Sequence, residues 1–143
     1  MAAHLLLIDD EQPFVETMAK RLGKRGYTVA TALSGEDGLK ALDADHSVDV
    51  VILDVKMPGM DGIETLKRIK AEHPLVEVLM LTGHATVASA IDGMKSGAYD
   101  YMMKPCDIDE LLAKVGEAYD QKQARETRIL EARARHIELR RGD

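Results

Sequence analysis

Aromatic residues, cysteine and long apolar runs are all scarce in this 143-residue sequence. Aromatic residues make up 3% of the chain, with no Trp and one Phe. A core therefore has to be aliphatic, and aromatic platforms for stacking single-stranded nucleic acid are disfavoured. The one cysteine excludes an internal disulfide framework and a cysteine-based zinc site. No apolar run approaches the roughly 20 residues of a membrane span, and the first residues lack the basic segment of a signal peptide. We expect a soluble, cytoplasmic protein without membrane contact.

Charge is distributed unevenly along the chain. Residues 1–120 contain 12 Lys or Arg against 21 Asp or Glu, a net charge of −9, whereas residues 121–143 contain 7 against 4, a net charge of +3. A body this acidic repels the phosphates of nucleic acid, so we expect this domain not to bind nucleic acid directly. The composition predicts one folded domain over 1–120 and a charged helical extension over 121–143, which continues the last helix toward a further domain.

Five short apolar runs alternate with stretches of helical periodicity. They cover residues 4–8, 27–31, 49–53, 76–81 and 99–103. The third run is rich in β-branched residues and nearly continuous, as is typical of a strand buried on both faces. Ser34 favours the start of the second helix, and Gly26 favours the end of the first. The alternation predicts right-handed βαβ units and an α/β fold, in which helices cover both faces of a five-stranded parallel sheet.

Polar side chains gather where the predicted strands end. The residues concerned are Asp9, Asp10 and Glu11 after the first strand, Asp54 after the third, Thr82 after the fourth and Lys104 after the fifth. Ligands of open parallel sheets bind at this edge. Clustered carboxylates without His or Cys favour a hard cation such as Mg²⁺, and a carboxylate can attack phosphorus as a nucleophile. The chain contains no Gly-rich nucleotide-binding motif of the P-loop type. The phosphoryl group is therefore expected to arrive from an already activated donor.

Four motifs carry a resemblance to a known family. They are LIDDE at 7–11, ILDVKMPGMDG at 52–62, LTGH at 81–84 and GAYDYMMKP at 97–105. In this order, each at the end of a predicted strand, they resemble the response-regulator receiver domains of two-component signalling, the CheY-like family, over about residues 4–120. The segments at 82–85 and 99–101 resemble the NtrC-like activator subclass. The resemblance implies a flavodoxin-like (βα)5 fold with strand order 2-1-3-4-5 and a cis Lys104–Pro105 bond.

The resemblance also implies roles for individual residues. Asp54 is the expected phosphoacceptor, and Lys104 is expected to pair with the phosphoryl oxygens. Thr82 is expected to move toward the phosphate while Tyr101 turns inward as the second part of the switch.

The implied metal is Mg²⁺ or Mn²⁺. Its expected ligands are Asp10, Asp54 and the backbone carbonyl of Lys56, with Asp9 holding its water shell. Two further positions, Lys56 and His84, are expected to tune the lifetime of the phosphate.

The function implied is that of a signalling switch. A sensor histidine kinase or phosphotransfer protein would donate the phosphoryl group from a phospho-histidine to Asp54 in a Mg²⁺-dependent step. The change would reach a face made of the fourth helix, fifth strand and fifth helix, which pairs with a second receiver or acts on an effector. Such a protein catalyses its own phosphorylation and dephosphorylation and is not otherwise an enzyme.

Three alternatives remain at this point. A haloacid-dehalogenase-like phosphatase also uses an Asp nucleophile, but it needs a second Asp at position 56, which is Lys here. A flavodoxin-type cofactor module needs a Ser/Thr/Gly loop after the first strand, and the acidic residues there would repel its phosphate. A phosphate-independent receiver could dimerise through 121–143, although Lys122 and Glu126 interrupt the weak apolar repeat of that segment.

Overall fold

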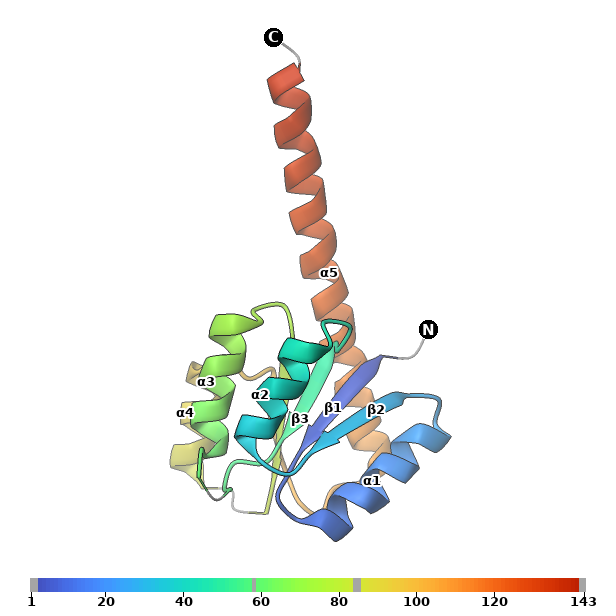
Figure 1. Cartoon of the computed structure of the whole chain (residues 1–143), viewed down its shortest axis with the longest axis vertical. Coiled ribbons are helices and arrows are strands. Elements are labelled where there is room, and N and C mark those ends of the chain that lie inside the picture. The colour runs from blue at the N-terminus through green and yellow to red at the C-terminus, as the bar shows by residue number, and fades with distance from the viewer. Residues whose placement is uncertain (1–2, 58, 84–85, 142–143) are drawn as a thin grey trace.

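The computed structural model describes residues 3–57, 59–83 and 86–141, in which five strands and five helices alternate (Figure 1). The strands are β1 (His4–Ile8), β2 (Thr28–Ala32), β3 (Val50–Leu53), β4 (Glu77–Thr82) and β5 (Asp100–Met103). The helices are α1 (Gln12–Lys24), α2 (Gly35–Ala44), α3 (Gly62–Glu72), α4 (Val87–Lys95) and α5 (Ile108–Arg141). All strands pair in parallel in the order β2-β1-β3-β4-β5. The α/β fold and the strand order expected from the sequence are confirmed.

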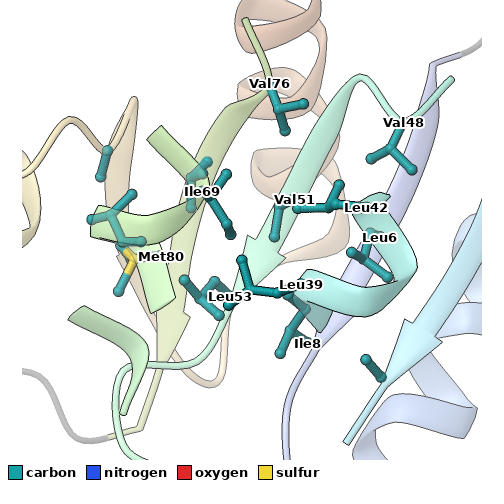
Figure 2. Packing of buried hydrophobic residues seen from close by; sticks show 14 of the residues in the cluster. Leu6, Ile8, Leu39, Leu42, Val48, Val51, Leu53, Ile69, Val76 and Met80 are labelled. Carbon is teal, nitrogen blue, oxygen red and sulfur yellow. The ribbon is translucent and has the colours of Figure 1, made fainter. Parts of the chain in front are cut away.

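Helices cover both faces of this sheet, as the alternation of buried residues requires (Figure 1). On one face, alternate strand residues such as Leu6 and Ile8 pack in one cluster with residues of α2 and α3 (Figure 2). On the other face, Leu5 and Leu7 pack against α1 and the first half of α5. Because successive strand side chains point to opposite faces, a run buried on both faces has to be apolar throughout.

Local signals place the ends of several elements. The Ser34 hydroxyl accepts a hydrogen bond from the Asp37 amide at 3.1 Å and caps α2. Gly26 has a φ of +94° just after α1, a conformation that a side chain disfavours. Strands β2 to β5 each begin one residue later than predicted. Since Thr82 pairs with Met103 across the sheet, Thr82 is the last residue of β4 instead of the first residue after it.

Helix α5 extends well beyond the body of the molecule (Figure 1). It runs for 34 residues without a break, and residues 127–139 are exposed. No helix in the described part of the chain is both long and apolar enough to cross a membrane. The helix continues through residue 120, so the boundary between domain and extension stays a prediction.

Candidate functional site

The backbone places three site residues at the carboxyl edge of the sheet. The Asp9 amide donates to the Ala32 carbonyl at 3.1 Å, and the Asp54 amide donates to the Ile8 carbonyl at 3.0 Å. The Lys104 amide donates to the carbonyl of Thr82 at 2.8 Å. Each bond extends the sheet's hydrogen bonding past the end of a strand, so rigid elements hold these residues.

Asp54 lies at the base of the site with 2% of its surface exposed. Its Oδ1 atom is buried and has no hydrogen-bond partner in the described part of the chain. A buried acceptor left without a partner costs about 1–3 kcal/mol, and more when it is charged. An oxygen in this situation is well suited to accept a cation or to attack an electrophile.

Two more carboxylates lie beside Asp54. Oxygens of Asp9, Glu11 and Asp54 all lie within 4.8 Å of one another. Asp9 is buried and Glu11 is exposed, and the Asp9 carboxylate accepts a hydrogen bond from the Glu11 amide at 2.9 Å. Three carboxylates this close repel one another unless a cation offsets their charge.

Lys104 supplies one such cation from the chain itself. Its Nζ atom donates to Asp9 Oδ2 at 2.5 Å and to Glu11 Oε1 at 3.1 Å. The same atom lies 4.0 Å from the centroid of the Phe14 ring, which adds a cation–π contact. Asp9, Glu11 and Phe14 together hold the ammonium group of Lys104 in the acidic cluster.

These contacts shift two pKa values. Burial raises the pKa of Asp9 above its ordinary 3.8, and the neighbouring Asp54 raises it further, although the hydrogen bond from Lys104 acts in the opposite direction. Burial alone would lower the pKa of Lys104, but Asp9, Glu11 and Asp54 hold it above its ordinary 10.5. Lys104 therefore stays charged at neutral pH.

The donor set fits Mg²⁺ or Mn²⁺. It consists of oxygens alone, and Oδ1 of Asp54 is buried without a partner among the residues that the structure describes. Such a set suits a hard divalent cation. Asp10 lies outside the group of three; its side chain is exposed and makes no hydrogen bond or ion pair with any described residue. Lys56 is exposed as well. The roles of Asp10 and of the Lys56 carbonyl as ligands stay predictions.

The loop after Asp54 depends on a close approach of two backbone segments at Gly62. The Gly62 amide donates to the Val55 carbonyl at 2.6 Å. A Cβ at position 62 would collide with the Asp54 carbonyl oxygen and lie 2.5 Å from the Val55 Cα atom. Glycine at 62 therefore allows α3 to begin directly against the backbone of Asp54.

The two expected switch residues lie on neighbouring strands. Thr82 is fully buried at the end of β4. Tyr101 on β5 is partly buried, packs on the α3–α4 side of the sheet, and its hydroxyl lies 2.9 Å from Ser89 Oγ of α4. Tyr99 directly precedes β5 and packs on the opposite side of the sheet, although alternation along a strand would put residues 99 and 101 on the same side. A change at Tyr101 is therefore placed to reach α4.

The structure gives a contact to Glu11, which the sequence places at this edge without a role, and adds two residues that the sequence did not mark as part of the site. Glu11 and Phe14 hold Lys104, and Ser89 contacts Tyr101. Nothing in the sequence indicates that Phe14 or Ser89 belongs to the site. His84 lies outside the described residues, so its expected role stays a prediction. The cis Lys104–Pro105 bond that the resemblance implies is confirmed.

Comparison with known proteins gives matches over most of the chain. A family model described as "Response regulator receiver domain" matches residues 5–116. The DNA-binding transcriptional regulator NtrC of Escherichia coli K12 is 38% identical over 112 residues, which are 78% of this chain and 24% of that protein. The transcriptional regulatory protein ZraR of the same strain is 40% identical over 114 residues, 80% of this chain and 26% of that protein. The chain thus spans about a quarter of these relatives.

Solved structures agree with the sequence matches. A response regulator receiver domain protein from Clostridium thermocellum superposes with a TM-score of 0.81 at 36% identity, covering 85% of this chain and 98% of that one. NtrX from Brucella abortus, solved in complex with ADP, superposes with a TM-score of 0.82 at 30% identity, covering 89% of this chain and 29% of that one.

Proposed function

Since this chain belongs to the response regulator receiver domain family, with NtrC-like regulators among its relatives, we propose that it switches state when Asp54 accepts a phosphoryl group. The donor we propose is the phospho-histidine of a sensor histidine kinase or a phosphotransfer protein. The observation that carries this proposal is the buried Oδ1 of Asp54, which has no hydrogen-bond partner among the described residues and lies beside two acids and a lysine.

The chemistry follows from the positions of these groups. An Asp54 carboxylate oxygen attacks phosphorus, an O–P bond forms and the N–P bond of the donor breaks. The donor histidine keeps the electron pair of that bond and takes up a proton. Lys104 leaves part of its contact with Asp9 and Glu11 to meet the new phosphoryl oxygens. The chemistry that Mg²⁺ supplies when bound is neutralisation of charge on the transferring group.

The output surface we propose is the face of α4, β5 and α5. Val87, Ile91, Met94 and Met103 are exposed there, and Val87 exposes 79% of its surface. Isolated exposed apolar residues are common, but a group on one face suggests a contact surface. Rearrangement of Thr82 and Tyr101 would alter this face through the Tyr101–Ser89 contact. A second receiver or an effector domain would bind to it.

The proposal also covers the effector that this domain controls and its location in the cell. NtrC and ZraR are named as transcriptional regulators, and each is about three times as long as this chain. We propose that this domain likewise controls an effector, acts in the cytoplasm, and catalyses only its own phosphorylation and dephosphorylation. The phosphatase alternative stays disfavoured because Lys56 stands where a second Asp is needed.

A phosphate-independent dimer is the second candidate function. Helix α5 exposes Ile129, Leu130 and Ile137 beyond the body of the domain, and these could form a seam with a second copy. Equal dimerisation of wild type and Asp54→Asn, with and without phosphoryl donor, would favour this candidate over the phosphorylation switch.

Metal removal gives the direct test of the proposed chemistry. We expect the protein, incubated with Mg²⁺ and a small acyl phosphate, to gain one phosphoryl group by intact mass. Chelation of the metal before the donor is added should abolish that gain, because the single positive charge of Lys104 leaves most of the charge on the transferring group unneutralised. An equal gain with and without metal would contradict the proposed mechanism.

Two variants distinguish Asp10 from Glu11 as the metal ligand. We expect Asp10→Asn to weaken Mg²⁺ binding at least tenfold, because the Asp10 carboxylate is exposed and is not bonded to any residue that the structure describes. Glu11→Gln should change affinity less than threefold, because Glu11 is already held by Lys104. Titration calorimetry measures both. The reverse order would assign the ligand role to Glu11.

A further inference from the structure

A second group of charged residues lies at the sheet edge opposite the acidic site. Asp49 directly precedes β3 and Glu77 opens β4. These two strands carry Asp54 and Thr82 at their other ends, so the second group is separated from the acidic site by the length of the strands (Figure 1). Both Asp49 and Glu77 bond to side chains of α5.

Glu77 is a buried carboxylate with three partners. It exposes 2% of its surface. Its Oε2 atom accepts from Gln121 at 2.6 Å, and its Oε1 atom accepts from Arg125 at 3.0 Å and from Lys70 of α3 at 3.4 Å. Gln121 and Arg125 are one turn apart on α5. The carboxylate therefore holds one face of this helix against the start of β4.

Asp49 holds the same turn of α5 from a neighbouring strand. Its Oδ1 atom accepts from Lys122 at 2.8 Å, and its Oδ2 atom accepts from the His4 amide at 2.8 Å. Lys122 exposes 7% of its surface and also bonds Glu126 at 2.8 Å. Breaking such a buried pair from one side is strongly destabilising, because it leaves a charge without a partner.

These contacts come at the point where apolar packing of α5 ends. The last apolar α5 residue that is fully buried is Ala118, with Tyr119 partly buried after it. From residue 127 to 139 the helix is exposed. A helix extends readily from a formed turn but starts poorly on its own. The turn at 121–126 is therefore the last part of α5 that the body of the domain can fix.

We infer that Asp49 and Glu77 form a two-point ionic anchor that fixes the direction and rotational phase in which α5 leaves the domain. Residues 121–126 then belong to the folded body, and residues 127–139 form a rigid arm. The anchor determines which way Ile129, Leu130 and Ile137 of that arm face relative to the sheet. This inference does not depend on phosphorylation, and unphosphorylated protein suffices to test it.

The test measures the orientation of the arm directly. Spin labels are attached to cysteines introduced by Lys20→Cys on α1 and Arg135→Cys on α5, in the full chain with Cys106→Ala. Electron–electron double resonance should give a narrow distance distribution with the anchor intact. We expect Asp49→Asn and Glu77→Gln each to at least double the width of that distribution. Glu117→Gln, which removes an exposed partner of Lys114 on the same helix, should leave it unchanged.

A milder variant covers the case in which these changes unfold the domain. Arg125 is 40% exposed, and its loss leaves Lys70 and Gln121 on Glu77. Arg125→Met should therefore keep circular dichroism and phosphorylation by acyl phosphate unchanged while it broadens the distribution measurably. Distributions as narrow as that of the labelled parent in every folded anchor variant would overturn the inference.

Discussion

Gly62→Ala is expected to destabilise the domain by about 3 kcal/mol, at the upper end of the range for overpacking. The added methyl group would collide with the Asp54 carbonyl oxygen and lie 2.5 Å from Val55 Cα and 2.8 Å from Val55 O. These are backbone atoms at the end of a buried strand, so they cannot move aside as a flexible side chain can. Thermal unfolding should show a melting temperature lower by roughly 10 °C.

The matched control for this change is Gly116→Ala. Gly116 lies in the interior of α5, and a Cβ there would meet nothing within 4 Å. Alanine at an open helical position should stabilise by up to about 1 kcal/mol. Two variants with the same chemical change should thus shift the melting temperature in opposite directions. A Gly62→Ala protein as stable as wild type would contradict the close approach of Gly62 to the backbone of Asp54 and Val55.

Lys104→Met is expected to slow phosphorylation by acyl phosphate by about 100-fold, the usual effect of removing one preorganised donor to a developing negative charge. Methionine keeps an unbranched, flexible stem near Phe14 but removes the ammonium that contacts Asp9 and Glu11. The three carboxylates would then repel one another more strongly and disfavour approach of a negatively charged donor. Single-turnover intact-mass kinetics measure this rate.

Lys114→Met is the control for the loss of one lysine charge. Lys114 is partly exposed and pairs with Asp100 and Glu117 instead of with Asp9 and Glu11. Exposed ion pairs of this kind contribute little, so its phosphorylation rate should stay within threefold of wild type. A Lys104→Met rate equally close to wild type would remove Lys104 from the mechanism.

The sequence predicts the fold of this chain well because its signals are local. Alternating apolar runs and helical periodicity locate every strand to within one residue at its start. Ser34 caps α2 and Gly26 follows α1, as their residue types indicate. The strand order has no local signal, and only the family resemblance provides it.

The acidic site is predicted in outline but not in its contacts. Strand ends alone place Asp9, Asp54 and Lys104 at one edge of the sheet. The pairing of Lys104 with Glu11 joins residues 93 positions apart, and the direction of a long side chain depends on packing that the sequence does not show. Phe14 looks like an ordinary core residue of α1 for the same reason.

The charged residues at the opposite edge of the sheet, around Asp49 and Glu77, are not predicted by sequence patterns. Lys122 and Glu126 look like defects in an apolar repeat, yet Lys122 pairs with Asp49, 73 positions earlier, and also with Glu126. Glu77 stands at the start of a buried strand, where a charged residue is unexpected. Its carboxylate is held there by partners 44 and 48 positions away in the sequence. Long-range charge pairs leave no periodic pattern, so they become visible only in three dimensions.

The most direct test of the central claim is intact mass after incubation with Mg²⁺ and acyl phosphate, compared between wild type, Asp54→Asn and Asp37→Asn. Asp37 is an exposed aspartate at the start of α2 and serves as the matched control. The account predicts a gain of one phosphoryl group in wild type and in Asp37→Asn, and none in Asp54→Asn. An undiminished gain in folded Asp54→Asn would contradict it.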